Sequence, residues 1–194
     1  MNKLISVVGA SGVGKTALVQ ALAHSGNFSV AYEQHAERPF QNLFKQDNRY
    51  ALANQIDYLL LRAEQEATLR ASSIIGLMDG GLDLDFHGFT RIFHHRRLLT
   101  DPEHDLCKRV YSFVRASFPF PDLIVRLNAD KDTVARRLSM RDRVNIASAD
   151  DAALFNSFLD EWLAGIAPHQ VLELDVSKEN IAYSKSVNTI LKRI

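Results

Sequence analysis

The chain has 194 residues, of which 46% are apolar and 24% charged, and its 23 basic and 23 acidic side chains cancel to a formal net charge of zero. This fits one globular domain spanning 1–194, and the balanced charge argues against a general nucleic-acid-binding surface. Cys107 is the only cysteine, which excludes an intrachain disulfide and favours the reducing cytoplasm. We expect neither a secretory signal nor a membrane span, since no apolar run approaches about 18 residues.

Short apolar runs typical of β-strands alternate with longer helical patterns along the chain. Five runs have the length and composition of strands: Leu4–Val8, Phe28–Glu33, Ser73–Asp79, Leu123–Leu127 and Val171–Val176. Several are continuously apolar, which predicts a parallel sheet covered on both faces. The alternation predicts a doubly wound α/β fold that binds ligands at the carboxyl ends of its strands.

Three of the helical segments have recognisable features. A helix from about Arg49 to Arg70 is apolar nearly all round at Tyr58–Leu61, so we expect it to be buried. Thr100-Asp-Pro-Glu103 forms a capping box that starts a helix over 101–118, and Ser148–Asp151 predicts another helix start. One face of the 101–118 helix carries Leu106, Val110, Phe113, Val114 and Ser117.

A complete phosphate-binding motif follows the first strand. Residues 9–16 read Gly-Ala-Ser-Gly-Val-Gly-Lys-Thr, which matches G-x-x-x-x-G-K-[ST] between a strand and the helical segment Ala17–Ala23. The N–H groups of such a loop surround a β-phosphate. We expect Lys15 to bridge the β- and γ-phosphates of ATP and the Thr16 hydroxyl to bind Mg²⁺. The expected nucleotide contacts are Gly9, Ser11, Gly12, Val13, Gly14, Lys15 and Thr16.

Polar residues that could hold the phosphoryl acceptor come next in the chain. Glu33 ends the second strand, where a carboxylate can reach an acceptor hydroxyl. Gln55 and Arg62 are seven residues apart on the long helix and therefore share one face. The pattern alone leaves open whether this face binds a substrate or is a polar stripe in contact with solvent.

Together these motifs resemble the deoxynucleoside kinase family. The family's order and approximate spacing are followed over about residues 1–180 by the P-loop, Glu33, Arg38–Phe44, Gln55–Arg62, Asp79 and the arginine-rich run 136–143. This combination is more specific than any one motif. The resemblance implies a P-loop kinase fold with a five-stranded parallel sheet flanked by helices, a LID segment at about 137–148, and a homodimer formed through helices around 88–118.

The resemblance also implies roles for individual residues. Glu33 looks like the general base that accepts the proton of a nucleoside 5′-hydroxyl, and Asp79 can hold magnesium with Thr16. Arg137, Arg141 and Arg143 match the family's LID arginines, which stabilise the transferring phosphate, whereas in isolation they would indicate only a basic helix face. The implied substrate-binding residues are Phe44, Gln55, Arg62, Asp85 and Phe89, with the last stacking on the base.

Three departures from the family pattern concern the acceptor. Where the family has an acid, an arginine and a serine, this chain has Asp79-Gly80-Gly81, so the arginine that lies beside the attacking oxygen in the family is missing. Two glycines permit positive φ but supply no charge. Phe44 replaces a tyrosine that contacts the sugar 3′-hydroxyl, and Asn145 and Ile146 replace acids after the LID arginines. Three explanations are open. The acceptor is an altered nucleoside or another small alcohol, a nearby residue such as Arg38 replaces the missing arginine, or phosphoryl transfer is weak.

Three functions remain open. The leading hypothesis is an ATP- and Mg²⁺-dependent nucleoside kinase. If Arg62 and Asp85 meet in one cleft, Asp85 can only accept hydrogen bonds and should favour adenine, guanine or cytosine over thymine. A monophosphate kinase of the thymidylate kinase type could use Arg38 and Arg62 to hold the acceptor phosphate, although Glu33 argues against it. A nucleotide-binding module without transfer would need neither Glu33 nor the LID arginines. Asp83 could be only a helix-start acid.

Overall fold

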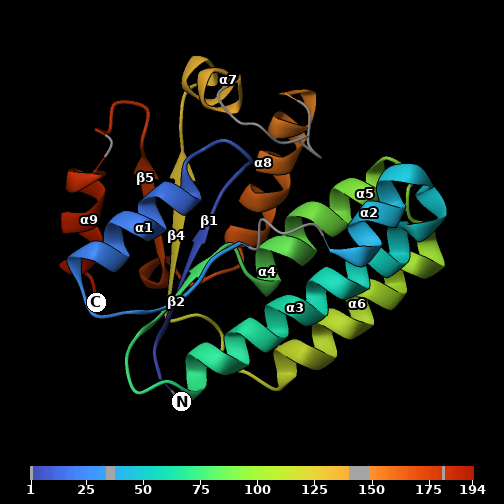
Figure 1. Ribbon diagram of the computed structural model, residues 1–194, viewed down its shortest axis with the longest axis horizontal. Coiled ribbons are helices and arrows are strands. Elements are labelled where there is room, and N and C mark those ends of the chain that lie inside the picture. The colour runs from blue at the N-terminus through green and yellow to red at the C-terminus, as the bar shows by residue number, and fades with distance from the viewer. Residues whose placement is uncertain (1, 34–37, 140–148, 181) are drawn as a thin grey trace.

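A five-stranded, entirely parallel sheet forms the centre of the computed structural model, which describes residues 2–33, 38–139, 149–180 and 182–194 (Figure 1). The spatial order is β2-β3-β1-β4-β5. The strands are β1 (Leu4–Val8), β2 (Ser29–Ala31), β3 (Gly76–Asp79), β4 (Leu123–Asn128) and β5 (Val171–Asp175). All five predicted strands are therefore present, and the predicted α/β fold class is confirmed.

Helices fill the connections between the strands. They are α1 (Lys15–Ser25), α2 (Pro39–Gln46), α3 (Ala51–Ala71), α4 (Leu82–Leu84), α5 (Arg91–His95), α6 (Asp101–Ala116), α7 (Lys131–Ser139), α8 (Ala149–Leu163) and α9 (Ser184–Leu191). A π-helical turn, η2 (Asp85–Thr90), joins α4 to α5, and short 3₁₀ turns occupy η1 (Asn48–Tyr50) and η3 (Pro168–Gln170). No helix in the described part of the chain is both long enough and apolar enough to cross a lipid bilayer.

Two strands are shorter than the sequence predicts. β2 covers only Ser29–Ala31, because this edge strand pairs with β3 over those three residues and nowhere else. β3 begins at Gly76 rather than Ser73, since a bend separates it from the end of α3. The apolar composition of these segments reflects burial, which extends beyond the residues that form ladder hydrogen bonds.

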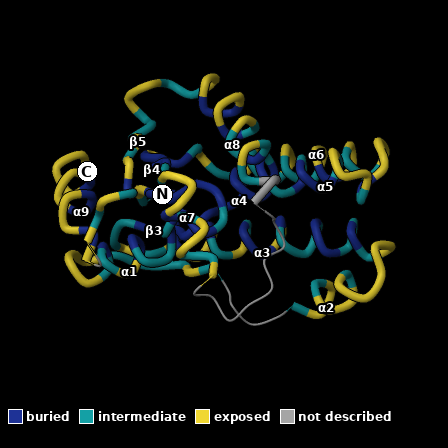
Figure 2. The backbone as a smooth tube through the Cα atoms, turned by 90° about the horizontal axis from the view of Figure 1, so that it is seen from above, coloured by how far each residue is buried: buried dark blue, intermediate teal, exposed yellow. Residues whose placement is uncertain are grey.

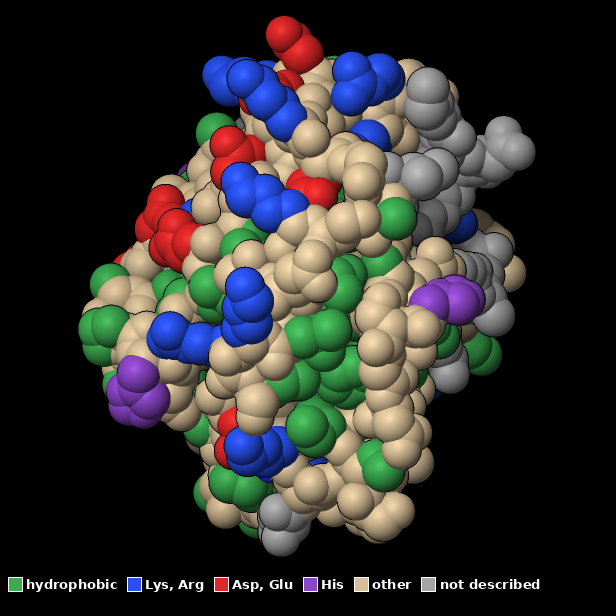
Figure 3. Space-filling view, turned by 90° about the vertical axis from the view of Figure 1, so that its left-hand side faces the viewer, with side chains coloured by type: hydrophobic (Ala, Val, Ile, Leu, Met, Phe, Trp, Pro, Cys, Tyr) green, Lys and Arg blue, Asp and Glu red, His purple; other side chains and the backbone are tan. Residues whose placement is uncertain are grey.

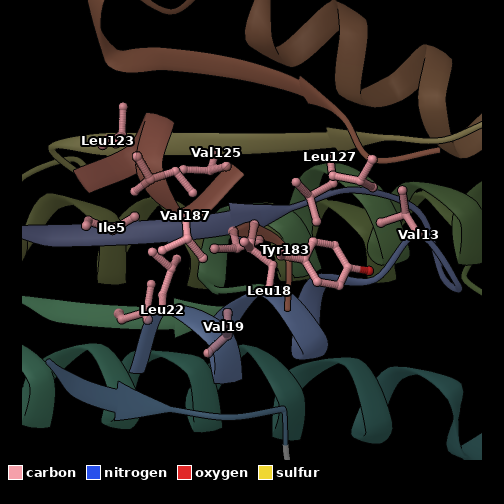
Figure 4. Close-up of a cluster of buried hydrophobic side chains, with 14 residues drawn as sticks. Ile5, Val13, Leu18, Val19, Leu22, Leu123, Val125, Leu127, Tyr183 and Val187 are labelled. Atoms are coloured by element: carbon pink, nitrogen blue, oxygen red, sulfur yellow. The ribbon is translucent and has the colours of Figure 1, made fainter. Parts of the chain in front are cut away.

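Alternate strand residues pack on opposite faces of the sheet. Ile5 and Val7 of β1 face α1 and α9, where they join a cluster that includes Leu18, Leu22 and Ile190 (Figure 4). The other face carries Val8 and Ile124, which pack against Leu84, Ile92 and the α8 residues Phe155 and Leu159. Both faces are covered, which explains why these strands are apolar at consecutive positions.

A helical layer extends beyond the sheet on the side of α3 and α6. These two helices run side by side, with α2 and α5 at their far end (Figures 1 and 2). Leu59, Phe86, Phe93 and Leu99 form the centre of this layer together with Cys107. The layer therefore has its own apolar core, which holds α3 rigidly beside the carboxyl end of β3.

Helix α6 begins at the predicted capping box and presents a wider apolar face than its neighbours cover. Glu103 Oε2 lies 2.7 Å from both the N–H and the hydroxyl of Thr100. Val110 and Val114 pack inward beside Cys107. Phe113, which belongs to the same predicted face, is 79% exposed.

The surface over α1 and α9 is of mixed charge. Figure 3 shows Lys and Arg side chains interspersed with Asp and Glu side chains on this face. Neighbouring charges of opposite sign reduce each other's field, so this face has no extended region of one sign.

Candidate active site

The glycines of the loop between β1 and α1 adopt conformations that other residues rarely take. Gly9, Gly12 and Gly14 have φ angles of 146°, 83° and 109°. A Cβ on Gly14 would overlap the Tyr183 hydroxyl, so this position has no room for a side chain. The loop ends at Gly14, and α1 starts at Lys15, which directs the first free N–H groups of the helix into the loop.

The Lys15 side chain folds back over the phosphate-binding loop. Lys15 Nζ is 3.0 Å from the carbonyl oxygen of Gly9 and 3.2 Å from that of Ala10, so its ammonium group lies across the mouth of the loop. Ser11 lies between these glycines, half-buried, and the Val13 side chain packs into the core below. This arrangement is the cradle that a triphosphate requires.

Thr16 and Asp79 meet across the β1–β3 ladder. Residue 79 is in register with Val7, the last strand residue but one before the loop. The Thr16 hydroxyl donates to Asp79 Oδ2 at 2.6 Å, and Asp79 Oδ1 is buried without a hydrogen-bond partner among the described residues. A hydroxyl and a carboxylate with an oxygen to spare are ligands that suit Mg²⁺, so the donor set fits the ion.

Arg137 approaches the loop from outside. Its Nη1 donates to the Val13 carbonyl oxygen at 2.5 Å, its Nη2 to that of Val176 at 3.0 Å, and its guanidinium lies 5.9 Å from the centre of the Tyr183 ring. The structure therefore attaches Arg137 to the loop's backbone. Arg141, Arg143, Asn145, Ile146 and Ser148 lie outside the described residues, so their predicted roles stay predictions.

On the acceptor side, Arg62 and Asp85 form a buried ion pair. Arg62 Nε donates to Asp85 Oδ2 at 2.8 Å, and the two residues are 3% and 4% exposed. Gln55 is also 3% exposed, and its Oε1 accepts from the Thr90 hydroxyl at 3.0 Å. The face of α3 that carries Gln55 and Arg62 is thus turned toward η2, and the alternative of a solvent-exposed polar stripe is wrong.

The charge of Glu33 acts on the same face of α3. Glu33 is half-buried two residues past β2. Burial raises the pKa of Tyr58 to about 12, with the charges of Asp85 and Glu33 adding to the effect. Burial also raises the pKa of Asp85, which the Arg62 guanidinium opposes. The charges of Asp85 in η2 and of Glu33 in the segment after β2 therefore both act on the side chains of α3 at Tyr58 and Arg62.

The segment after Asp79 follows the predicted glycine-dependent path. Gly80 and Gly81 have φ angles of 84° and 131°. Ser6 donates from its hydroxyl to the Gly80 carbonyl oxygen at 2.6 Å, and the Gly80 N–H donates to the Val7 carbonyl oxygen at 2.9 Å. The turn is therefore held to β1 beside the P-loop.

The structure places the two predicted aromatic contacts in the protein core. The Phe44 ring lies 5.0 Å from that of Phe93, where it docks α2 on α5. The Phe89 ring lies 4.9 Å from that of Phe155 at a steep angle. Each ring is still partly exposed, and the substrate-binding roles of Phe44 and Phe89 stay predictions.

Sequence reasoning missed three features near the site. Tyr58 lies between Gln55 and Arg62 on the same helix face, and its spacing could have revealed it. Tyr183, at φ 50°, closes against Gly14 from the far end of the chain, which no local pattern predicts. Asp83 lies in the first turn of α4, where an acidic residue is favoured. Its carboxylate is also buried, with Oδ2 at 3.0 Å from Arg115 Nη1.

Comparisons with known proteins identify the family of the chain. The family model described as "Deoxynucleoside kinase" matches residues 5–194. "Deoxyadenosine/deoxycytidine kinase" of Bacillus subtilis (strain 168) is 21% identical over 199 aligned positions that cover 100% of this chain and 92% of the relative. "Deoxyadenosine kinase" of Dictyostelium discoideum is 24% identical over 72% of this chain but only 57% of its own length.

Solved structures show the same fold. Deoxyadenosine kinase from M. mycoides with bound dCTP superposes with a TM-score of 0.81 at 15% identity, covering 98% of this chain and 100% of that chain. The same enzyme with bound dATP gives 0.78 at 17% identity, covering 97% and 99%. At such low identities the superpositions establish the P-loop kinase fold, while the family model matches nearly the full length.

Proposed function

Because the chain belongs to the deoxynucleoside kinase family and is thus an ATP-dependent nucleoside kinase, we propose that Glu33 is its general base. In the proposed step the 5′-oxygen of the nucleoside attacks the γ-phosphorus of ATP, its proton passes to the Glu33 carboxylate, and ADP leaves with the electrons of the broken P–O bond. Lys15 would hold the β- and γ-phosphates. Thr16 and Asp79 would hold Mg²⁺, which supplies charge neutralisation when bound.

The observation that carries the proposal is the buried Arg62–Asp85 pair beside Glu33. A nucleobase that enters this cleft meets a carboxylate fixed by a guanidinium at 2.8 Å, with Gln55 on the same helix face. Asp85 accepts hydrogen bonds, so a base with an exocyclic amino group satisfies it, whereas a thymine carbonyl leaves it unpaired. The curated relatives are named for deoxyadenosine and deoxycytidine, whose bases both carry such a group.

The monophosphate kinase alternative has less support. It requires arginines that are available to an acceptor phosphate, and both candidates are engaged by carboxylates. Arg38 contacts Asp57 through Nε and Nη2, both at 2.5 Å, and Arg62 contacts Asp85. A phosphate would have to displace these partners, and it would also face Glu33.

ADP release measured with a panel of nucleosides and monophosphates tests the proposal. An unpaired buried acceptor costs about 1–3 kcal/mol, so we expect kcat/KM for deoxyadenosine, deoxyguanosine or deoxycytidine to exceed that for thymidine by about 10–100-fold. Asp85→Ala should narrow the gap, and Lys15→Ala should remove turnover while the protein stays folded. Preference for thymidine would show that Asp85 does not face the base, and activity only on monophosphates would favour the alternative.

Assembly and location complete the proposal. A homodimer is supported by two apolar side chains that α6 leaves exposed, Phe113 at 79% and Leu106 at 39%. They are seven residues apart, so they share one face of the helix, and an exposed apolar face of this kind is typical of an interface between proteins. A reducing cytoplasm suits Cys107, which is a free and buried thiol.

A further inference from the structure

The Arg62 guanidinium lies above Gly80, the position at which the family carries its missing arginine. A Cβ built on Gly80 would be 3.6 Å from Arg62 Nη2 and 3.9 Å from Cζ, which are ordinary van der Waals distances. Gly80 has a φ of 84°, a conformation that disfavours any larger residue. The space above the turn is therefore occupied by a side chain that comes from α3 rather than from the turn itself.

The three nitrogens of Arg62 face different groups. Nε donates to Asp85 and Nη1 donates to Gln65 Oε1 at 3.0 Å, so neither of these contacts uses Nη2. Gln65 is itself tied to the β2 end, because its amide donates to the Tyr32 carbonyl oxygen at 3.1 Å. The planar guanidinium group is thus held through Nε and Nη1. Its third nitrogen, Nη2, lies over Gly80 in the turn between Asp79 and α4.

Several carboxylates surround this guanidinium. Burial lowers the pKa of Arg62, but the charges of Asp85, Glu33 and Asp79 outweigh burial and raise it. Asp85 is proposed to bind the base, Glu33 is the proposed general base and Asp79 is the proposed magnesium ligand. Arg62 therefore lies at the junction between the base pocket and the reacting atoms.

Arg38, the substitute that the sequence suggested, is committed elsewhere. Both of its contacting nitrogens bind Asp57 at 2.5 Å, on the helix face next to α2. Attraction from Asp57 raises the pKa of Arg38 chiefly through that hydrogen bond. Releasing Arg38 would leave Asp57 unpaired, whereas Arg62 already reaches Gly80 without breaking a contact.

We propose that Arg62 has a catalytic role beyond its ion pair with Asp85: its Nη2 replaces the arginine that is missing at Gly80. This inference rests on the proposed function. As the 5′-oxygen bonds to phosphorus and its proton moves to Glu33, Nη2 donates a hydrogen bond to the attacking oxygen or the transferring phosphoryl oxygens. No further reactant is needed, and ADP and the nucleoside monophosphate are the only products besides the proton.

Arg62→Lys and Arg38→Lys form a matched pair for the test. Lysine keeps the charge but has no planar fork, so it cannot serve Asp85 and the reacting oxygens together. We expect Arg62→Lys to lower kcat by about 10²–10³-fold, the usual loss for one donor to a developing charge, in addition to any rise in KM. Arg38→Lys should keep the wild-type kcat. Nucleoside binding measured calorimetrically without ATP gives the base-pocket contribution separately.

Two outcomes would overturn the inference itself, and a third would overturn the proposed function on which it rests. A loss confined to KM and to calorimetric affinity in Arg62→Lys would make Arg62 a base-pocket residue only. Loss of kcat in Arg38→Lys but not in Arg62→Lys would transfer the role to Arg38. If wild-type protein phosphorylates no nucleoside, the proposed function fails before this inference is reached.

If Arg62→Lys does not fold, Gly80→Ala and Gly81→Ala test whether Arg62 Nη2 takes part in phosphoryl transfer. Both positions have positive φ, so both alanines are strained, and Gly81, at φ 131° and ψ 177°, lies in a region that is essentially restricted to glycine. The methyl group at 80 would cover Arg62 Nη2 at an ordinary contact distance of 3.6 Å, beside Leu84 at 3.4 Å, whereas the one at 81 would press on Met78 and Ser6 at 3.2 and 3.3 Å. Packing alone therefore makes Gly81→Ala the more disruptive change, and a larger loss in Gly80→Ala would come from the covering of Nη2. We expect Gly80→Ala to lower kcat more than Gly81→Ala does, and equal kcat values in the two variants would contradict the proposal.

Discussion

At the scale of single residues, Glu33 is the proposed general base, and a site that only binds nucleotide would not need it. We expect Glu33→Gln to lower kcat by about 10²–10⁴-fold with ATP affinity nearly unchanged, because glutamine keeps the shape but cannot accept the proton. The measurement is steady-state ADP release together with ATP titration. Glu64→Gln, the same change at an exposed position of α3, is the control. Normal turnover in Glu33→Gln would make Glu33 structural.

His87 couples the folded state to pH. Its ring stacks on Trp162 with centroids 5.1 Å apart, and its Nε2 lies 3.2 Å from the Tyr111 hydroxyl oxygen. That hydroxyl donates its only proton to Asp83 at 2.8 Å, so His87 must donate to it as the neutral Nε2–H tautomer. Burial, with Arg91 adding to it, lowers the pKa of His87 from 6.5 to about 4.

The sign of the resulting pH dependence follows from this lowered pKa. Between about pH 6.5 and pH 4 the unfolded chain binds a proton that the folded chain excludes, so the free energy of unfolding falls as the pH falls through this window. The full effect is about 3 kcal/mol at most. Urea unfolding at several pH values should show a shallower dependence in His87→Phe, while His24→Phe on exposed α1 keeps the wild-type slope. An unchanged slope in His87→Phe would refute the assignment.

At the scale of elements, a buried ion network joins α3, α6 and α4. Arg115 of α6 binds Glu66 of α3 at 2.5 Å and Asp83 of α4 at 3.0 Å, and Arg70 binds the same Glu66 at 2.8 Å. Asp83 stands two residues before Asp85. The network therefore fixes the helix start that delivers Asp85 to Arg62.

Removing Arg115 tests this network. Arg115→Met should lower the free energy of unfolding by about 3–5 kcal/mol, because Asp83 is then buried without its counter-charge. Arg109→Met, on the exposed side of the same helix, should stay within about 0.5 kcal/mol of wild type. Both follow from urea unfolding monitored by circular dichroism. Equal, small losses would mean that solvent or relaxation replaces the Arg115 contacts.

The π-helical turn η2 is the other element that shapes the site. The Thr90 hydroxyl lies 3.1 Å from the Asp85 carbonyl oxygen and 3.0 Å from Gln55 Oε1, so it fills the widened turn and holds Gln55. Such turns occur often at functional sites. Here the turn sets the relative position of two residues proposed to read the base.

At the scale of the whole molecule, the exposed side of α6 predicts the assembly. Light scattering at micromolar concentration should give a dimer mass, and Phe113→Asp should give a monomer, because a charge at the centre of an apolar contact is costly. Leu43→Asp alters another exposed apolar residue, on α2 and 37% exposed, and should remain dimeric. A monomer mass for the wild type, or dissociation only in Leu43→Asp, would contradict the prediction.

The five strands and the positions of the expected nucleotide-binding residues could be predicted from the amino-acid sequence alone. The P-loop is a local motif whose backbone path depends on its own glycines, and Lys15 and Thr16 follow it directly. Asp79 could be placed as well, because the carboxyl ends of parallel strands meet at one edge of the sheet. These features depend on neighbours in the chain or on the rule for parallel strands, so a pattern predicts them.

The surroundings of the acceptor depend on contacts between distant segments, which no sequence pattern predicts. Whether Arg38 or Arg62 reaches Gly80 depends on which helix faces meet. Arg38 is bonded to Asp57, whereas Arg62 lies over the turn at Gly80. The same holds for Phe113, which shares an apolar face with Val110 but is left uncovered. A helix pattern fixes the angle of each side chain about its own axis, whereas the partner that each angle meets is set by packing between segments far apart in the chain.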